Sequence, residues 1–214
     1  MKKVVITVIS VLVLLFIVFL FGGIYLTHKL ISDKTGILIT AAENETPQKF
    51  NYSEIDTLPP VLQKYFRFAL EDGITKPRFL RLKQKGEFKT SISADFRDIE
   101  AQQYFLTSKP GFLWHGKIYL TSFLWLDGID TYFNGDGALL IKFLSGISMT
   151  RETGDEIKQA QIVRWLLEAA WFPAALLPNE NLKWIKYDST SATLLFNEKD
   201  IEIKARFFFN GNGS

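Results

Sequence analysis

Residues 99–120 read IEAQQYFLTSKPGFLWHGKIYL, and this stretch decides the fold. Its two halves, 99–107 and 112–120, are apolar and aromatic runs of strand length, and residues 108–111 between them have the composition of a β-turn. Because successive side chains of a strand point to opposite faces, the second half gathers its apolar side chains on one face. That face carries Phe112, Trp114, Gly116, Ile118 and Leu120. The stretch therefore predicts a β-hairpin with one strongly apolar face.

The same period of two continues on both sides of this hairpin. Upstream, residues 79–89 place Leu80 and Leu82 on one face and a basic stripe, Arg81, Lys83 and Lys85, on the other. Downstream, residues 130–133 and 138–144 flank Asn-Gly-Asp-Gly, a strong signal for a second hairpin. The order of these runs predicts an antiparallel meander.

Two helical patterns interrupt the strands. The first begins at Pro59-Pro60 and repeats its apolar residues at helical spacing up to Leu70. The second covers residues 156–171 and ends before Pro173. Further strands are predicted at 182–187, 192–197 and 201–209. The fold class expected for residues 58–214 is therefore α+β, mainly β: a curved antiparallel sheet with two helices.

The C-terminal residues 207–214 read FFFNGNGS, an apolar strand followed by a hairpin-type turn. Such a turn points toward a further strand, and an apolar strand with an open edge favours aggregation. We therefore expect that a C-terminal portion is missing from this chain; the alternative is a frayed natural terminus.

An uncharged run, Val4 to Leu26, precedes the domain. At 1.5 Å per residue it spans about 34 Å, which exceeds the roughly 30 Å of a bilayer's hydrocarbon core. The alternative is a cleaved signal peptide, whose apolar region is usually only about 7–15 residues. The prediction is a transmembrane anchor over residues 1–32 and a polar tether over 33–57. Lys2 and Lys3 favour a cytoplasmic N-terminus and an extracytoplasmic domain on a bacterial cytoplasmic membrane, although Lys29 and Lys34 weigh against this orientation.

Composition excludes several classes of function. Residues 1–34 carry four Lys against one Asp, whereas the remaining 180 residues carry 21 basic and 22 acidic side chains. The domain is thus nearly neutral, which gives no support for nucleic-acid binding. The chain has no Cys, so thiolate catalysis and Cys-ligated metals are absent. His115 is the domain's one histidine, and Ser145 lies outside any G-x-S-x-G motif. We expect no cofactor, no metal and no enzymatic activity.

The aromatic content suggests where a ligand would bind. The chain has 19 Phe, 5 Trp and 7 Tyr, and two interpretations stay open: an ordinary hydrophobic core, or a curved sheet that lines a site for a lipid or another apolar molecule. The candidate residues for burying such a ligand are Leu80, Leu82, Trp114, Ile118 and Trp125.

Charged candidates are fewer. Glu168 lies in the apolar sequence WLLEAAW, and Arg164 is four residues earlier, so either a ligand-binding carboxylate or a structural ion pair is possible. A structural pair would fix the helix on the sheet with help from Arg81 or Arg151. A cluster of Glu168, His115 and a basic residue would instead indicate an enzyme. The carboxylates Asp127 and Asp130 are interpreted as turn residues, with a pair of functional carboxylates as the alternative. The basic stripe is interpreted as a solvated strand face, with contact to anionic lipid headgroups as the alternative.

The order of several motifs resembles an uncharacterised family of bacterial membrane-anchored proteins. The resembling segments are LPPV at 58–61, Arg81 with Gln84 and Gly86, GFLW at 111–114, DTY at 130–132, and RWLLEAAWFPAALLP at 164–178. The strand and helix pattern is similar to the half-barrel of the LolA and LppX lipoprotein carriers. That resemblance implies a concave apolar face, and fold alone does not fix function. The expected role is binding of a lipid or another apolar ligand; the alternative is a structural or protein-interaction subunit of the bacterial envelope.

Overall fold

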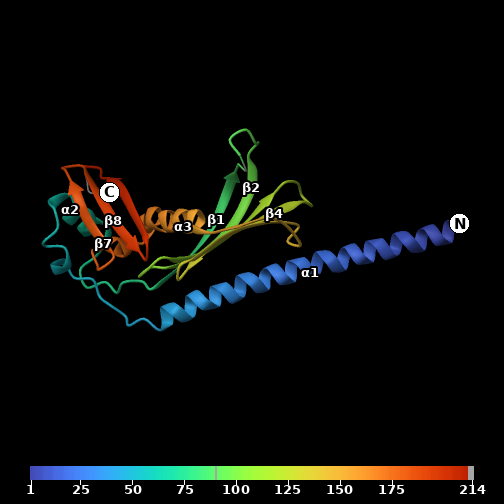
Figure 1. The fold of residues 1–214 in the computed structure, drawn as a ribbon, viewed down its shortest axis with the longest axis horizontal. Coiled ribbons are helices and arrows are strands. Elements are labelled where there is room, and N and C mark those ends of the chain that lie inside the picture. Colours follow the sequence, from blue (N-terminus) through green and yellow to red (C-terminus); the bar gives the residue numbers. More distant parts are fainter. Residues whose placement is uncertain (90, 212–214) are drawn as a thin grey trace.

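The computed structural model describes residues 1–89 and 91–211. It confirms an α+β fold with antiparallel sheets behind a long apolar helix (Figure 1). The helices are α1 (Lys2–Glu43), α2 (Pro60–Ala69) and α3 (Asp155–Glu168), with short 3-10 segments η1 (Tyr52–Glu54), η2 (Ala169–Trp171) and η3 (Pro173–Leu176). The last three residues of the predicted terminal turn, 212–214, lie outside the described residues.

Six strands form the larger sheet in the order β1-β2-β3-β4-β5-β6, so each strand pairs with its neighbour in sequence. Their bounds are β1 (Phe79–Phe88), β2 (Arg97–Leu106), β3 (Gly111–Tyr119), β4 (Trp125–Phe133), β5 (Asp136–Phe143) and β6 (Ile147–Thr153). The predicted meander is thus confirmed, and Asn134 and Gly135 take the positive φ angles that the β4–β5 turn requires. Strand β6 was not predicted, and β4 begins five residues earlier than expected.

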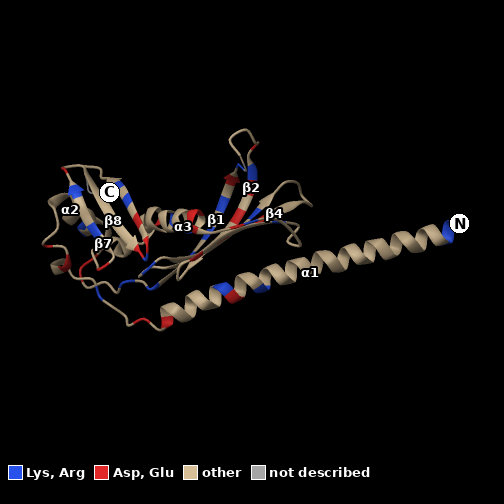
Figure 2. Ribbon diagram, in the orientation of Figure 1, with Lys and Arg blue, Asp and Glu red and all other residues tan. Residues whose placement is uncertain are grey.

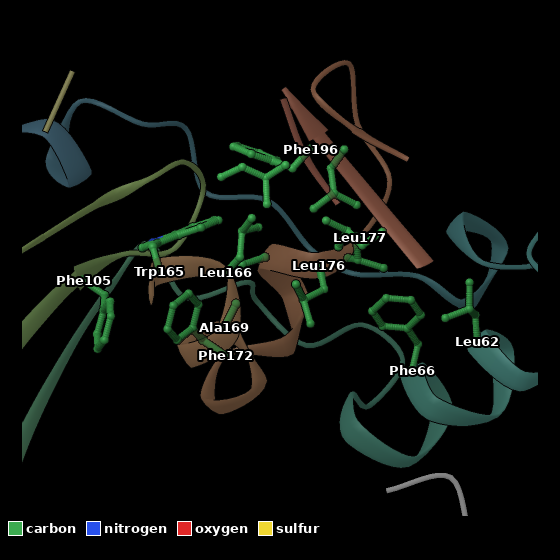
Figure 3. Packing of buried hydrophobic residues seen from close by; sticks show 14 of the residues in the cluster. Leu62, Phe66, Phe105, Trp165, Leu166, Ala169, Phe172, Leu176, Leu177 and Phe196 are labelled. Atoms are coloured by element: carbon green, nitrogen blue, oxygen red, sulfur yellow. The ribbon is translucent and has the colours of Figure 1, made fainter. Parts of the chain in front are cut away.

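The remaining strands, β7 (Leu182–Tyr187), β8 (Ser191–Glu198) and β9 (Ile201–Phe208), form a separate antiparallel sheet. The segment from α3 to η3 fills the space between the two sheets and α2. Figure 3 shows Trp165 and Phe172 of this segment between Phe105 of the six-stranded sheet and Phe196 of β8. The rings of Phe105 and Phe172 lie 4.9 Å apart, and those of Trp165 and Phe196 lie 6.2 Å apart. The main core is therefore aromatic and joins both sheets.

The two faces of the six-stranded sheet have different helical neighbours. We name them the α3 face and the α1 face. On the α3 face, Phe105, Phe112 and Tyr132 pack with Trp165 in the main core. On the α1 face, Leu106 and Leu113 pack with Leu38 and Ala42 of α1 in a smaller cluster. By strand alternation the α3 face also carries Leu80, Leu82, Gln84, Ile99, Ala101, Gln103, Trp114, Ile118, Leu126 and Asp130.

Helix α1 corrects the prediction of a polar tether over 33–57. The helix continues without a break to Glu43, and Leu38 and Ala42 are buried against the sheet. Only the N-terminal part of α1 leaves the sheet. No residue in its most apolar stretch is buried, and this stretch is long and apolar enough to cross a membrane. Figure 2 shows this exposed part free of charged residues beyond the N-terminus.

Candidate functional site

A chain of polar side chains crosses the middle of the α3 face. Gln103 on β2 is fully buried, and its Nε2 donates to Glu168 Oε2 on α3 (2.7 Å). Its Oε1 accepts a hydrogen bond from Gln84 Nε2 on β1 (3.0 Å), and Gln84 Oε1 accepts one from Trp114 Nε1 (2.8 Å). Because unpaired buried amides are costly, this series of hydrogen bonds fixes both glutamine side chains in one orientation.

Arg164 completes the chain from the helix side. Its Nε donates to Glu168 Oε1 (3.1 Å), and its Nη1 contacts Asp130 Oδ2 on β4. Asp130 also accepts a bond from Gln161 Nε2 (3.1 Å). The Arg164 guanidinium lies 5.1 Å from the centre of the Trp114 ring, within cation–π range.

These contacts settle where the predicted charged pair lies. Arg164 and Glu168 form an ion pair that docks α3 on the sheet, with Asp130 and Gln103 as the sheet partners in place of the expected Arg81 or Arg151. Asp130 belongs to β4, so its interpretation as a turn residue is wrong. Asp130 and Glu168 both accept hydrogen bonds from Arg164 and a glutamine, which suits a structural role.

Trp114 divides the α3 face into two parts because two glycines lie beneath its ring. A Cβ atom built on Gly116 would come within 2.3 Å of Trp114 Cη2, and one built on Gly128 within 3.1 Å of Trp114 Cζ3. The indole thus lies flat across β3 and β4 where no side chain stands in its way. On one side of it, Leu80 and Leu82 pack into the core beneath α3.

On the other side of Trp114 the face stays apolar, and we name this part the open end of the α3 face. It consists of Ile99, Ile118, Leu126, Ile141 and Phe143. Among the described residues, neither of the two hydrophobic clusters includes these side chains. Ile118 is buried, with 6% of its surface exposed, whereas the other four are half-buried. The open end is therefore an apolar surface beyond the reach of the α3 core.

Trp125 does not belong to this surface. It pairs with Tyr119 at the start of β4, which places it on the α1 face, so its grouping with Trp114 and Ile118 is wrong. Its Nε1 donates to Asp127 Oδ2 and to Ser145 Oγ (both 3.1 Å), and Lys117 Nζ lies 4.6 Å from the centre of its ring.

A second polar cluster surrounds Asp127 on the α1 face. Asp127 is 1% exposed and belongs to β4, so it too is no turn residue. His115 Nε2 donates to its Oδ1 (2.8 Å), and Ser145 Oγ donates to its Oδ2 (2.6 Å). Burial alone raises the pKa of Asp127, but the hydrogen bonds from His115 and Ser145 outweigh it and hold that pKa below its usual range.

The geometry of this cluster is not that of a nucleophilic triad. The carboxylate lies between the serine and the histidine, whereas activation of a hydroxyl requires the imidazole in the middle. His115 and Glu168 also lie on opposite faces of the sheet, so the mixed cluster that would indicate an enzyme does not form. Within residues 1–89 and 91–211, no group of three His, Asp or Glu side chains is placed to hold a metal ion.

The Asp127 cluster instead joins the sheet to α1. Thr27 Oγ1 donates to the backbone oxygen of Ser145 (2.8 Å), and Lys142 Nζ donates to Thr27 Oγ1 (2.9 Å). One turn earlier on α1, a Cβ built on Gly23 would lie 2.6 Å from Gly146 Cα. The helix therefore touches the β5–β6 turn backbone to backbone.

A separate groove of about 460 Å³ lies between the start of α2 and the ends of β7 and β9. It includes the Pro59-Pro60-Val61 segment, together with Lys64, Tyr187, Thr190 and Phe209. Lys64 Nζ contacts the backbone oxygen of Gly211 across it. Sequence reasoning identified neither this groove nor the roles of Gln103, Ser145 and Thr27, because each depends on a partner distant in sequence.

Comparison with known proteins gives a family but no activity. A family model described as "Family of unknown function (DUF6544)" matches residues 48–214, which is most of the chain. No curated protein matches, and no solved structure matches.

Proposed function

The chain belongs to DUF6544, a family of unknown function, and we propose that it is a single-pass membrane protein that binds a lipid or another apolar molecule on the open end of the α3 face. In this proposal α1 crosses the bacterial cytoplasmic membrane with its N-terminus in the cytoplasm, and the domain lies outside. The role is binding, with no chemical step.

One observation carries the proposal: the open end is apolar and lies outside both hydrophobic clusters. A sheet face of this kind gains free energy by covering its side chains, at roughly 25 cal/mol per Å² of apolar surface removed from water. An acyl chain lying over the half-buried Ile99, Leu126 and Ile141, with Ile118 beneath it, provides that cover. Trp114 closes the site on the α3 side, since its ring lies across Gly116 and Gly128.

The location of this surface also supports a membrane-derived ligand. Ile118 and Leu126 pair with each other near the end of the sheet that carries the β5–β6 turn, and α1 leaves the sheet at that turn. The open end and α1 lie on opposite faces of the sheet, so an acyl chain from the bilayer around α1 reaches the open end by passing around the β3–β4 turn at this end of the sheet. Of the predicted ligand residues, we retain Trp114 and Ile118 in this role and assign Leu80, Leu82, Arg164 and Glu168 to the docking of α3.

The test uses the full chain in lipid nanodiscs that contain a phospholipid with a photoreactive diazirine near the end of one acyl chain. After illumination, peptide mapping by mass spectrometry locates the lipid adducts. We expect adducts on the β2 and β3 segments that contain Ile99 and Ile118, in addition to those on α1.

A matched pair of variants tests which face of the six-stranded sheet the lipid contacts. Ile99→Asn puts an amide into the open end, whereas Asp98→Asn puts the same side chain one residue earlier on the opposite, exposed face. We expect the first to reduce the β3 adducts severalfold and the second to leave them unchanged, with both variants folded by circular dichroism. Adducts on α1 without any on β2 or β3 would reject the proposal and favour the protein-interaction role.

A further inference from the structure

The two ends of the six-stranded sheet carry different kinds of turn. At one end lie the β2–β3 and β4–β5 turns, residues 107–110 and 134–135, which expose no large hydrophobic side chain. At the other end lie the β1–β2, β3–β4 and β5–β6 turns. We name these the polar end and the anchor end of the sheet.

The anchor end exposes large apolar side chains in turns, where polar residues are the rule. Ile92 is 99% exposed and Phe123 is 83% exposed, and Phe96 and Leu124 are exposed beside them. Ile147 and Met149 extend this surface onto the start of β6. Exposed apolar side chains gathered at one end of a domain mark a surface that is covered by a partner or a membrane.

Helix α1 identifies the partner. Twenty residues of helix, from Val4 to Gly23, span the roughly 30 Å of a hydrocarbon core, and Gly23 touches Gly146 in the β5–β6 turn, as does the ring of Phe19. This turn therefore lies at the boundary between acyl chains and headgroups when α1 crosses the bilayer. Figure 1 shows these hairpin ends at the end of the sheet beyond which the exposed part of α1 extends, with the turn at β4 nearer to the helix than the β1–β2 turn, which rises away from it.

Basic side chains accompany the apolar ones at the anchor end. Lys89 Nζ lies 4.5 Å from the centre of the Phe96 ring, and Arg97 Nη1 donates to the backbone oxygen of Leu120 (3.3 Å). Aromatic rings beside Lys and Arg are typical of protein surfaces that lie in the headgroup region, where rings bury and cations meet lipid phosphates. A protein partner would not need to lie at the level of the hydrocarbon boundary.

We propose that the anchor end of the sheet inserts Ile92, Phe96, Phe123 and Leu124 into the headgroup and acyl boundary of the bilayer that α1 crosses. The domain then rests on its own membrane through these turns and does not hang free. This inference rests on the part of the proposed function in which α1 crosses a membrane. It does not depend on whether the open end binds a lipid.

Single-cysteine labelling tests this contact, since the natural chain has no Cys. Ile92→Cys and Phe123→Cys are each labelled with a small environment-sensitive fluorophore in the full chain, in nanodiscs of phosphatidylcholine and phosphatidylglycerol. Quenching by lipids with a doxyl group near the glycerol end of the acyl chain reports contact with the boundary region. Lys109→Cys at the polar end is the matched control. Val11→Cys in α1, measured with lipids that carry the doxyl group near the end of the acyl chain, reports whether the helix itself is in the bilayer.

We expect the labels at 92 and 123 to be quenched about threefold more than the label at 109, as for side chains buried about 5–10 Å into the interface. Equal, weak quenching at 92, 123 and 109 together with strong quenching at 11 would overturn this inference and leave the anchor intact. Weak quenching at 11 would instead reject the anchor on which both proposals rest.

Discussion

Gly116→Ala tests how the middle of the α3 face is built. The new Cβ atom would lie 2.3 Å from Trp114 Cη2 and 2.6 Å from its Cζ2, so the indole has to move. This movement breaks the hydrogen bond from Trp114 Nε1 to Gln84 Oε1, which is 2.8 Å long. Overpacking costs about 1–3 kcal/mol, and a lost hydrogen bond about 1 kcal/mol. We expect the free energy of unfolding to fall by about 2–4 kcal/mol.

Two other glycines on the same face provide matched controls. A Cβ built on Gly86 meets no atom within 4 Å, so Gly86→Ala should change the free energy of unfolding by no more than about 1 kcal/mol, in the stabilising direction. Gly128→Ala, with its nearest contact at 3.1 Å, should fall between the two. The assay is urea unfolding of the full chain in non-ionic micelles, followed by circular dichroism.

A double-mutant cycle identifies the cause. In a Trp114→Leu background the ring is gone, so adding Gly116→Ala should cost little beyond the first substitution. The reasoning is refuted if Gly116→Ala costs no more than Gly86→Ala. It is equally refuted if the alanine costs as much without the indole as with it.

Three further predictions follow from contacts outside that face. Asp127→Asn should lower the free energy of unfolding by about 1–3 kcal/mol near pH 7. Because the folded-state pKa of Asp127 is depressed, its carboxylate stabilises the fold above about pH 4, and this stabilisation is lost as the pH falls through that pKa. In urea unfolding, the difference in the free energy of unfolding between Asp127→Asn and the natural chain should therefore shrink at low pH. Burial raises the pKa of Tyr65 to about 12, so the stabilisation from its neutral phenol is complete below about pH 10 and is lost as the pH rises toward 12. In thermal unfolding at alkaline pH, Tyr65→Phe should therefore lose less stability with rising pH than the natural chain. An equal loss in both proteins contradicts this prediction. Gly23→Ala should push α1 off the β5–β6 turn and speed hydrogen exchange at the Gly146 amide. Gly22→Ala should leave that exchange unchanged, since a Cβ built on Gly22 meets no atom within 4 Å. Equal exchange in the two variants would show that the close approach is unimportant.

Local periodicity was sufficient for most of the fold. Alternating side chains predicted β1, β2, β3 and β5 to within a few residues, and the prolines predicted the start of α2. Strand β6 was not predicted because its sequence, ISMTRET, is short and mostly exposed on both faces, so it shows no alternation of apolar and polar side chains. The signals that succeeded were those contained within a few neighbouring residues.

The candidate site was less accessible to sequence reasoning because its contacts join distant residues. Trp125 follows an irregular turn, and the alternation of faces cannot be carried across such a turn. Asp127 and Asp130 looked like turn residues because their partners, His115 and Arg164, lie on other elements. The surrounding apolar sequence did indicate the Arg164–Glu168 pair, since both residues lie on one helix at i, i+4 spacing.

The continuity of α1 links the two proposals. Two sets of contacts hold the helix on the sheet: Leu38 and Ala42 toward one end, and Gly23 and Thr27 toward the other. Gly23 and Leu38 are about 22 Å apart along the helix, so these contacts fix its direction as well as its position. If α1 crosses the membrane as proposed, a helix held in this way sets the tilt of the domain relative to the bilayer, which a flexible tether cannot do. In the proposed orientation the anchor end then faces the membrane, and the open end of the α3 face lies near the lipid that we propose it binds.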